Sequence, residues 1–251
     1  MLQADDLERH FQGRPAVSGV SFCAGQGEVV GFLGPNGAGK TTTLRMLAGQ
    51  LEPDRGRVSI DGIDIWANRR AAQARLGYLP EGAPLPDDLT PLSFLRLVAS
   101  LRGYAAAKAR RATDHALWGA QILDVAEQPI GTLSKGYRRR VAFAAAILAD
   151  PPVLLLDEPT DGLDPNQKRT VRGLIAAMAP HKAILISTHA LDEVEAMCSR
   201  VIVIDRGRIV ADNTPAGLVS GPAGGGPHAG LEAVFHALTA ATEPRTQRGR
   251  A

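Results

Sequence analysis

Cysteine is scarce in this chain of 251 residues, which contains only Cys23 and Cys198. The two thiols lie far apart in the sequence and lack the spacing of a metal site or of a redox pair. They are therefore expected to be ordinary thiols, and their small number is consistent with a reducing, cytosolic compartment.

An excess of charge of one sign is also lacking. The 28 Lys and Arg residues nearly balance the 26 Asp and Glu residues, which leaves a net charge of +2. This balance implies no strongly charged partner, and we expect no binding to nucleic acid. The hydrophobic fraction of 45% is ordinary for a globular protein, so a sizeable buried core is expected.

Long hydrophobic runs are missing as well. The longest apolar run extends from Val141 to Ala149, far short of the roughly 20 residues that a membrane-spanning helix needs. The N-terminal residues MLQADDLERHF lack the basic start and the apolar stretch of a signal peptide. We therefore expect that the chain does not cross a membrane by itself and that any role at a membrane requires a partner.

Short apolar runs bounded by turn residues predict the strands. They occur at residues 1–32, 57–60, 74–80, 153–156 and 183–187. The last two runs are wholly apolar, which suits a parallel sheet covered on both faces. Two more apolar runs flank Asp205-Arg206-Gly207 and predict a hairpin.

Helical spacing prevails between residues 82 and 149, where strands are scarce. Phe94, Val98 and Leu101 repeat at helical intervals, and residues 105–127 are rich in alanine and helical in pattern. A second helix is predicted for residues 135–149. We interpret this region as a helical insert.

The C-terminal part changes in composition. Residues 220–230 (SGPAGGGPHAG) have the composition of a flexible linker. Apolar residues then recur at the spacing of a short amphipathic helix over residues 231–238. The plainer alternative is a helix that simply packs on its own core. The polar end of the chain, to residue 251, is expected to be disordered.

A glycine-rich segment follows the apolar run that ends at Leu33. Residues 34–41 fit the phosphate-loop pattern G-x-x-x-x-G-K-[ST]. Glycines let several backbone N–H groups converge on a phosphate, Lys40 adds a mobile charge, and the Thr41 hydroxyl suits Mg²⁺. The expected nucleotide contacts are Gly34, Pro35, Asn36, Gly37, Ala38, Gly39, Lys40, Thr41 and Thr42.

Two acids end the apolar run at residues 153–156. Asp157 and Glu158 come just past a predicted parallel strand, at the edge where ligands bind in α/β sheets. Asp157 suits Mg²⁺, and Glu158 is placed to orient or deprotonate an attacking water. His189 follows the neighbouring predicted strand and could contact the terminal phosphate. The plainer alternatives are a solvated Asp-Glu-Pro turn and a polar histidine cap.

Further segments match one family in its order of motifs. Leu133-Ser134-Lys135-Gly136-Tyr137 resembles LSGGQ, the signature of the ATP-binding cassette (ABC) transporters. Gly162-Leu163-Asp164-Pro165 resembles the family's D-loop, and Ser187-Thr188-His189 resembles its histidine switch. The resemblance covers roughly residues 2–219. Without the other motifs, the residues from Leu133 to Tyr137 would indicate only a capped helix start.

The resemblance implies an α/β fold with a phosphate-loop NTPase (RecA-like) core and a mostly parallel sheet. An N-terminal antiparallel β subdomain and an inserted helical subdomain, about residues 82–149, complete an ATPase unit at residues 1–219. Two copies, or one copy and a homologous cassette, would sandwich two ATP molecules head to tail. Ser134, Lys135 and Gly136 of one copy would then complete the site of the other, beside the D-loop residue Asp164.

The resemblance also implies ATP hydrolysis with Mg²⁺, coupled to a separate integral-membrane permease. Glu158, His189 and Lys40 would be catalytic, and Thr41, Asp157 and Glu81 would serve the metal. The chain would lie peripherally at the cytoplasmic face of the cell membrane. The signature variant, Glu81 and the ending at residues 231–235 resemble a branch of bacterial exporters.

The sequence departs from the family pattern at a few positions. Lys135 and Tyr137 stand where the signature has glycine and glutamine, and Glu81 stands where glutamine is usual. Phe11 takes the place of the aromatic residue that stacks on adenine, usually a tyrosine. These positions are where this cassette is expected to differ from its relatives.

Two other functions remain open at this point. One is an ABC-type ATPase of DNA repair or translation. This chain, however, has neither the long coiled-coil insert of the repair members nor the second cassette of the translation members. The other is a non-catalytic nucleotide sensor, against which Lys40, Asp157 and Glu158 argue.

Overall fold

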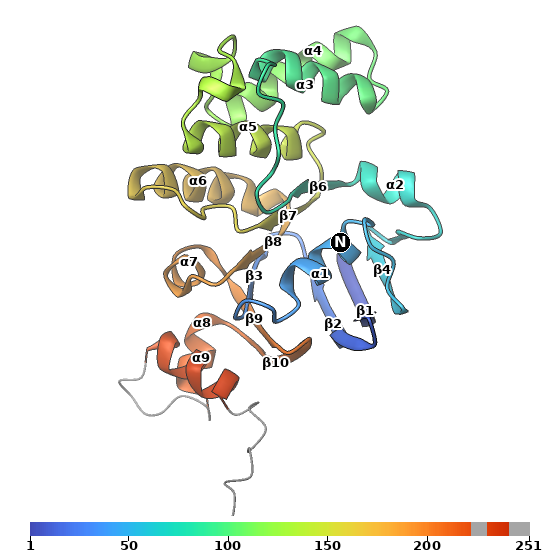
Figure 1. Ribbon diagram of the computed structural model, residues 1–251, viewed down its shortest axis with the longest axis vertical. Coiled ribbons are helices and arrows are strands. Elements are labelled where there is room, and N and C mark those ends of the chain that lie inside the picture. The colour runs from blue at the N-terminus through green and yellow to red at the C-terminus, as the bar shows by residue number, and fades with distance from the viewer. Residues whose placement is uncertain (222–229, 241–251) are drawn as a thin grey trace, which may run out of the picture.

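The computed structural model describes residues 1–221 and 230–240, and its centre is a six-stranded sheet (Figure 1). The strand order is β10-β9-β3-β8-β7-β6, and every neighbouring pair is parallel except β9 and β10. The strands are β3 (Val29–Leu33), β6 (Leu76–Leu79), β7 (Val153–Asp157), β8 (Ala183–Thr188), β9 (Arg200–Asp205) and β10 (Arg208–Asn213). The carboxyl ends of β3, β7 and β8 therefore meet at one edge.

The middle strands are buried on both faces, as their wholly apolar runs predict. Side chains of a strand alternate between faces, so β7 contributes to two cores. Leu154 and Leu156 pack with the helices α5 (Lys135–Ile147) and α6 (Pro165–Met178). Val153 and Leu155 pack with α1 (Lys40–Leu47) and the N-terminal strands.

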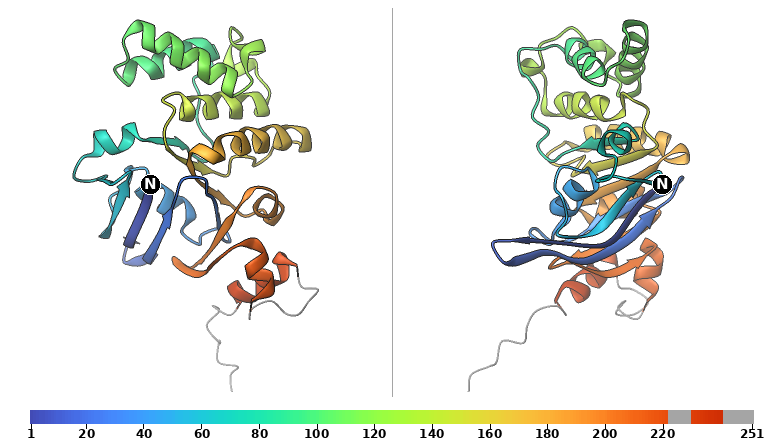
Figure 2. Two further views of the ribbon diagram at one scale, coloured as in Figure 1. Left: turned by 180° about the vertical axis from the view of Figure 1, so that it is seen from behind. Right: turned by 90° about the vertical axis from the view of Figure 1, so that its right-hand side faces the viewer.

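A second sheet is antiparallel and lies beside α1 (Figures 1 and 2). Its order is β2-β1-β4-β5, formed by β2 (Arg14–Ala24), β1 (Leu2–Phe11), β4 (Arg55–Ile60) and β5 (Ile63–Asp64). Phe22 of β2 meets Phe32 of β3 with the ring centroids 5.6 Å apart. This sheet therefore closes the second core over the central sheet.

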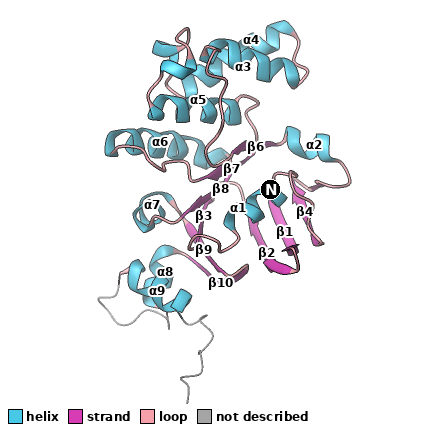
Figure 3. Ribbon diagram, viewed as in Figure 1, coloured by secondary structure: helices cyan, strands magenta, loops and turns pink. Residues whose placement is uncertain are grey.

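Helices without strands occupy the upper end of the molecule in Figure 3. They are α3 (Pro91–Leu101), α4 (Ala106–Gly119) and α5, and the short 3-10 turns η1 (Leu123–Val125) and η2 (Ile130–Thr132) lie between α4 and α5. The helix predicted for 105–127 ends at Gly119, because Gln121 adopts a left-handed backbone with φ of 54°. The helix predicted for 135–149 is α5, which ends two residues earlier.

The remaining elements refine the prediction at other places. The strand expected at 74–80 is shorter, because α2 (Arg69–Ala74) precedes it with Asn68 as its N-cap. The hairpin of β9 and β10 is confirmed, with left-handed Arg206 and Gly207 in its turn. The other helices are the 3-10 turn η3 (Ala179–His181), α7 (Leu191–Met197), α8 (Pro215–Ser220) and α9 (Leu231–Ala240).

Helix α9 packs on the chain's own core through Leu231 and Val234, which are buried. Most of the predicted linker and the predicted disordered tail fall at residues 222–229 and 241–251, outside the described residues. The division into an ATPase unit at 1–219, a linker and a tail stays a prediction. Within the described ranges, no helix is both long and apolar enough to span a bilayer.

Candidate functional site

The glycine-rich segment forms the loop between β3 and α1. A Cβ on Gly34 would lie 2.4 Å from the carbonyl oxygen of Ile204, so only glycine fits there. Gly39 has a φ of 105° and caps α1 without a side chain, and a Cβ on it would lie 2.5 Å from the Ala16 carbonyl oxygen. The loop is therefore shaped by close approach of backbone to backbone on both sides.

The hairpin turn of β9 and β10 braces this loop. The Gly207 N–H donates to the Ala38 carbonyl oxygen at 2.8 Å, and the Gly207 carbonyl oxygen accepts from the Ser18 N–H at 2.8 Å. A Cβ on Gly207 would lie 2.7 Å from the Ala16 carbonyl oxygen. The turn is thus wedged between the phosphate loop and β2, and it holds the loop from behind.

A pocket of about 350 Å³ opens over the loop. It is lined by Ala16, Pro35, Asn36, Gly37, Gly39, Lys40, Thr41, Thr42, Glu81 and Glu158. Most of these residues were expected at the nucleotide, and Ala16 was not. The pocket brings Glu81 and Glu158 to the same wall as the start of α1, where backbone N–H groups and the helix dipole favour an anion.

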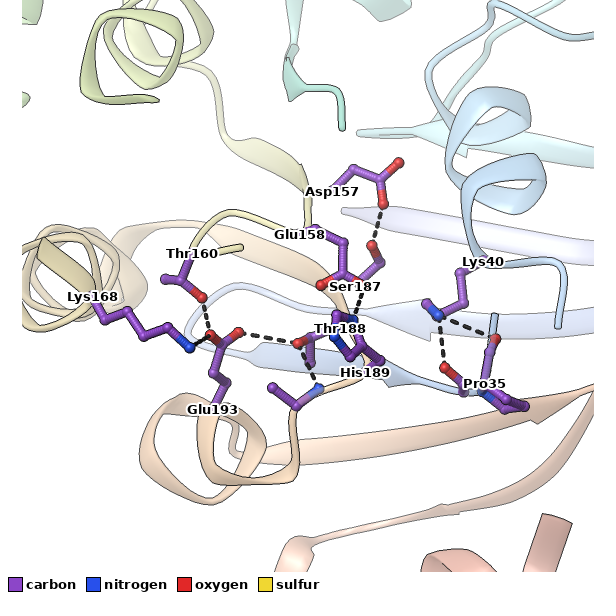
Figure 4. Close-up of polar contacts among 12 residues, drawn as sticks. Pro35, Lys40, Asp157, Glu158, Thr160, Lys168, Ser187, Thr188, His189 and Glu193 are labelled. Carbon is purple, nitrogen blue, oxygen red and sulfur yellow. Dashed lines mark hydrogen bonds and ion pairs between the residues drawn. The ribbon is translucent and has the colours of Figure 1, made fainter. Parts of the chain in front are cut away.

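Lys40 is buried at the first position of α1, with only 7% of its surface exposed. Its Nζ donates to the carbonyl oxygens of Gly34, at 2.7 Å, and Pro35, at 3.3 Å (Figure 4). Burial lowers the pKa of Lys40, and the charges of Glu158, Asp157 and Glu81 oppose this shift. The Lys40 ammonium therefore donates to neutral carbonyl groups in an acidic environment. A polyanion would give it stronger, charge-assisted hydrogen bonds.

Asp157 ends β7 and is fully buried. Its Oδ1 accepts from the Ser187 hydroxyl of β8, whereas its Oδ2 is buried and lacks a hydrogen-bond partner among the described residues. A buried carboxylate oxygen without a donor is costly unless a ligand supplies one. Carboxylate and hydroxyl oxygens suit Mg²⁺, so Asp157, with Thr41 and Glu81 on the pocket wall, fits the expected metal.

Glu158 directly follows β7 and holds a left-handed backbone with φ of 47°. Such a conformation costs a non-glycine residue roughly 1–2 kcal/mol, and strain of this kind often marks functional sites. Burial raises the pKa of Glu158, while a hydrogen bond from His189 opposes the rise. The two side chains meet through Nδ1 and Oε1 at 2.9 Å (Figure 4).

The signature segment lies on the helical side of the chain and does not line the pocket. Ser134 is the N-cap of α5, as predicted, and its side chain accepts from the Tyr137 N–H at 3.3 Å. The Lys135 side chain lies against Gly162, since a Cβ built there would be 1.7 Å from Nζ. Gly136 leaves room for the Gln167 side chain of α6, whose atoms would lie within 2.6 Å of a Cβ.

Gly34 and Ala38 of the phosphate loop do not line the pocket, and the predicted contacts Phe11 and Asp164 lie outside it. Phe11 is 46% exposed at the end of β1, with the Arg9 guanidinium 5.2 Å from its ring centroid. Asp164 is the N-cap of α6 and accepts from the N–H groups of Asn166 and Gln167 at 2.9 and 3.0 Å. Neither residue reaches the phosphate loop within this single chain.

Arg139 is a site residue that the sequence analysis missed. Its guanidinium donates to the carbonyl oxygens of Asp157, at 2.7 Å, of Glu158, and of Pro159, at 3.1 Å. The arginine therefore clasps the backbone that carries both acids from the side of α5. It is one of three consecutive arginines, so the sequence offered no signal that set it apart.

Comparisons with known proteins show which family this chain matches. The family described as "ABC transporter" matches residues 17–161. The chain is 38% identical to the Nod factor export ATP-binding protein I of Paraburkholderia xenovorans (strain LB400) over 224 residues, which are 89% of this chain and 74% of that protein.

Solved structures are similar over most of the chain. The structure of an ATP binding subunit of an ABC transporter superposes with a TM-score of 0.84 and 29% identity, covering 95% of this chain and 99% of that one. A dimeric structure of a bacterial ABC transporter cassette has a TM-score of 0.77 at 23% identity, over 85% of this chain and 98% of that one, and shares the fold. The expected phosphate-loop NTPase fold is thus confirmed, and the chain belongs to the ABC transporter family.

Proposed function

We propose that this chain hydrolyses ATP as one of two cassettes paired head to tail, and that hydrolysis drives an exporter in the membrane. The observation that carries the proposal is the meeting of Lys40, Asp157 and Glu158 at one sheet edge, around the phosphate-loop pocket. Asp157 keeps a buried oxygen without a partner, Lys40 rests on neutral carbonyl groups, and burial raises the pKa of Glu158. A nucleotide triphosphate with its metal would supply the missing partners.

The phosphate loop, from Gly34 to Thr42, would hold the phosphates through its backbone N–H groups, with Lys40 on the outer ones. Thr41, Asp157 and Glu81 would hold Mg²⁺. When bound, the ion neutralises charge on the phosphate oxygens. Phe11 would stack on the adenine ring.

Glu158 would orient the attacking water and accept its proton. A carboxylate whose pKa is raised by burial is a stronger base than an exposed one, which suits this role. His189 is 53% exposed at its side chain, so its ring can reach the terminal phosphate while Nδ1 stays on Glu158. Lys40 would stabilise the charge that develops on the phosphoryl group.

The second copy would contribute the signature. Ser134, Lys135 and Gly136 begin α5 and present a helix N-terminus that the chain's own pocket does not use. This separation, and the dimeric state of the cassette whose fold the chain shares, support a head-to-tail pair in which Asp164 lies near the boundary. The pair would be two copies of this chain, or this chain with a homologous cassette.

A groove of about 700 Å³ suits a membrane partner. It lies between α2, β6 and the end of α3, next to Pro80 and hence close to Glu81. Arg69, Arg70 and Arg102 line it together with Leu101, which is 80% exposed. An amphipathic segment with acidic side chains, supplied by a separate permease, would fit it, and the chain would then sit peripherally at the cytoplasmic face. Export follows the printed name of the Nod factor relative.

Replacing Glu158 by Gln tests the proposal. The dissociation constant of ATP should stay within about twofold of the wild-type value, whereas turnover should fall by at least about 100-fold, because only the proton acceptor is lost. Glu127→Gln, an exposed acid on the helical side, is the matched control and should keep full turnover. Comparable turnover in the Glu158→Gln variant and the unchanged chain would refute the assignment.

A further inference from the structure

Another buried carboxylate, that of Glu193, lies near the pair formed by Glu158 and His189. Glu193 belongs to α7 and is 2% exposed. Its Oε2 accepts from the Thr188 hydroxyl at 3.0 Å, its Oε1 accepts from the Thr160 hydroxyl, and Lys168 Nζ lies 3.4 Å from Oε1 (Figure 4). Both oxygens therefore have donors, and the charge has a counter-ion.

The three partners come from three different segments at the site: the end of β8, the turn after β7 and the first turn of α6. Thr188 precedes His189 and also accepts from the Ala190 N–H at 3.0 Å, so its hydroxyl fixes the backbone on both sides of the histidine. Thr160 follows Glu158 by two residues. Lys168 belongs to the first turns of α6, whose N-cap is Asp164.

Glu193 thus touches neither His189 nor Glu158, yet it holds the loops that carry them. Those two side chains meet at 2.9 Å, and a shift of either loop would change this distance. Because a buried carboxylate cannot lose a donor without cost, the three contacts keep one arrangement. The cluster also connects the beginning of α6 to the histidine loop.

We propose that Glu193 is a positioning residue for ATP hydrolysis, which sets His189 against Glu158 and links both to α6 through Lys168. The inference rests on the proposed function, in which His189 and Glu158 act on ATP. Removing the carboxylate should impair turnover through His189 while nucleotide binding persists, because among the described residues the hydrogen bonds and the ion pair of Glu193 go to Thr188, Thr160 and Lys168 and not to the phosphate loop.

The first experiment measures turnover and ATP affinity of Glu193→Gln in the full chain. The amide keeps the size of the side chain but cannot accept from both hydroxyls. Turnover should fall by about tenfold, and the dissociation constant of ATP should stay within about twofold. Glu195→Gln, an exposed acid on the same helix, is the matched control and should leave both values unchanged. Equal loss of affinity and turnover would overturn the proposal.

A double variant separates positioning from simple destabilisation. In a His189→Ala background, Glu193→Gln should cost less than about twofold more in turnover, because both changes act through the same histidine. If Glu193→Gln only destabilised the protein, its fold-loss of turnover would multiply with that of His189→Ala in the double variant. Lys168→Arg should restore most of the turnover that Lys168→Met loses, since the charge opposite Glu193 returns.

A spectroscopic measurement keeps this inference distinct from the proposed function. The His189 ring signals in the NMR spectrum of the nucleotide-free chain should shift or broaden in Glu193→Gln and stay unchanged in Glu195→Gln. Unchanged His189 signals would overturn the positioning role even in a fully active enzyme. A chain without ATPase activity whose signals do shift would refute the proposed function and leave the contact between the loops standing.

Discussion

The buried charges at the phosphate-loop pocket and the buried charge of Glu193 differ in how fully other side chains satisfy their hydrogen-bonding groups. Glu193 has two hydroxyl donors and a lysine. At the pocket, Asp157 keeps one oxygen without a partner, Lys40 rests on carbonyl groups, and burial raises the pKa of Glu158. A buried charge whose partners all come from the chain needs no ligand, whereas buried charges that lack partners indicate where a ligand completes the structure.

Lys40→Met should show the largest effect. The dissociation constant of ATP should rise by about 100-fold or more, the loss expected for a buried ionic contact of about 3 kcal/mol. The melting temperature of the nucleotide-free chain should not fall, because methionine removes a desolvated ammonium. Calorimetric titration and thermal unfolding measure the two effects.

The control for this variant comes from the satisfied cluster. Lys168→Met should leave ATP affinity within about twofold, yet lower the free energy of unfolding by about 1–2 kcal/mol, because Glu193 is left without its counter-ion. If both lysine variants lost the same stability, the contrast between the two regions would not hold.

Gly34→Ala should be nearly as damaging, through the backbone that frames the pocket. Its Cβ would lie 2.4 Å from the Ile204 carbonyl oxygen, which should cost about 2–3 kcal/mol of unfolding free energy. Gly37→Ala meets no atom within 4 Å and carries only the strain of its φ of 80°, about 1 kcal/mol. Denaturant unfolding ranks the pair, and the reverse order would contradict the close approach seen at Gly34.

Glu158→Gln should stabilise the nucleotide-free chain in a pH-dependent way. Burial raises the pKa of Glu158, so folding favours its protonated form, and stability is lost as the pH rises through that pKa. The variant lacks this cost. Its melting temperature should exceed that of the unchanged chain at pH 8, and the difference should shrink as the pH falls.

The same exchange at Glu193 sharpens this test. Glu193→Gln should lower the melting temperature at pH 8, where Glu158→Gln raises it, because it removes contacts rather than an unsatisfied charge. Scanning unfolding at a series of pH values distinguishes the two variants. If the melting-temperature difference between Glu158→Gln and the wild-type chain grew as the pH fell, the predicted pH dependence would be wrong.

Glu81→Gln should have the smallest effect. Glu81 is exposed on the pocket wall, and its charge is the weakest of the three that oppose the fall in the Lys40 pKa. Removing it should change the Mg²⁺ concentration for half-maximal turnover by about two- to threefold, as for an exposed ionic contact of about 0.5 kcal/mol. An unchanged Mg²⁺ dependence would exclude Glu81 from the metal site.

Much of this site could be predicted from short segments of sequence. The phosphate loop, the two acids at the end of β7 and the cap at Ser134 depend on local chemistry, so their residue types and spacing predict them. Arg139, Glu193 and Gly207 act through contacts with residues that are distant in sequence. An arginine among arginines, or a glutamate within a helix, reveals nothing about the carbonyl or hydroxyl it will meet.

The fold shows the same limit. The apolar runs predicted the central strands, while α2 and the early end of α4 depended on a cap and on a single left-handed residue, Gln121. The role of the signature is even less accessible to sequence reasoning from local chemistry, since the pocket in this chain does not contain it. Its meaning in the sequence came from the family resemblance.

The place of the Gly207 turn has a consequence for biosynthesis. Strand β3 is paired only with β8 and β9, and the loop that follows it is braced by a turn made more than 160 residues later. A ribosome-bound chain that ends before Ala183 therefore exposes both edges of β3 and has an unformed phosphate loop. We expect ATP binding only after β8, β9 and the Gly207 turn have been synthesised, because the phosphate loop lacks these supports before then.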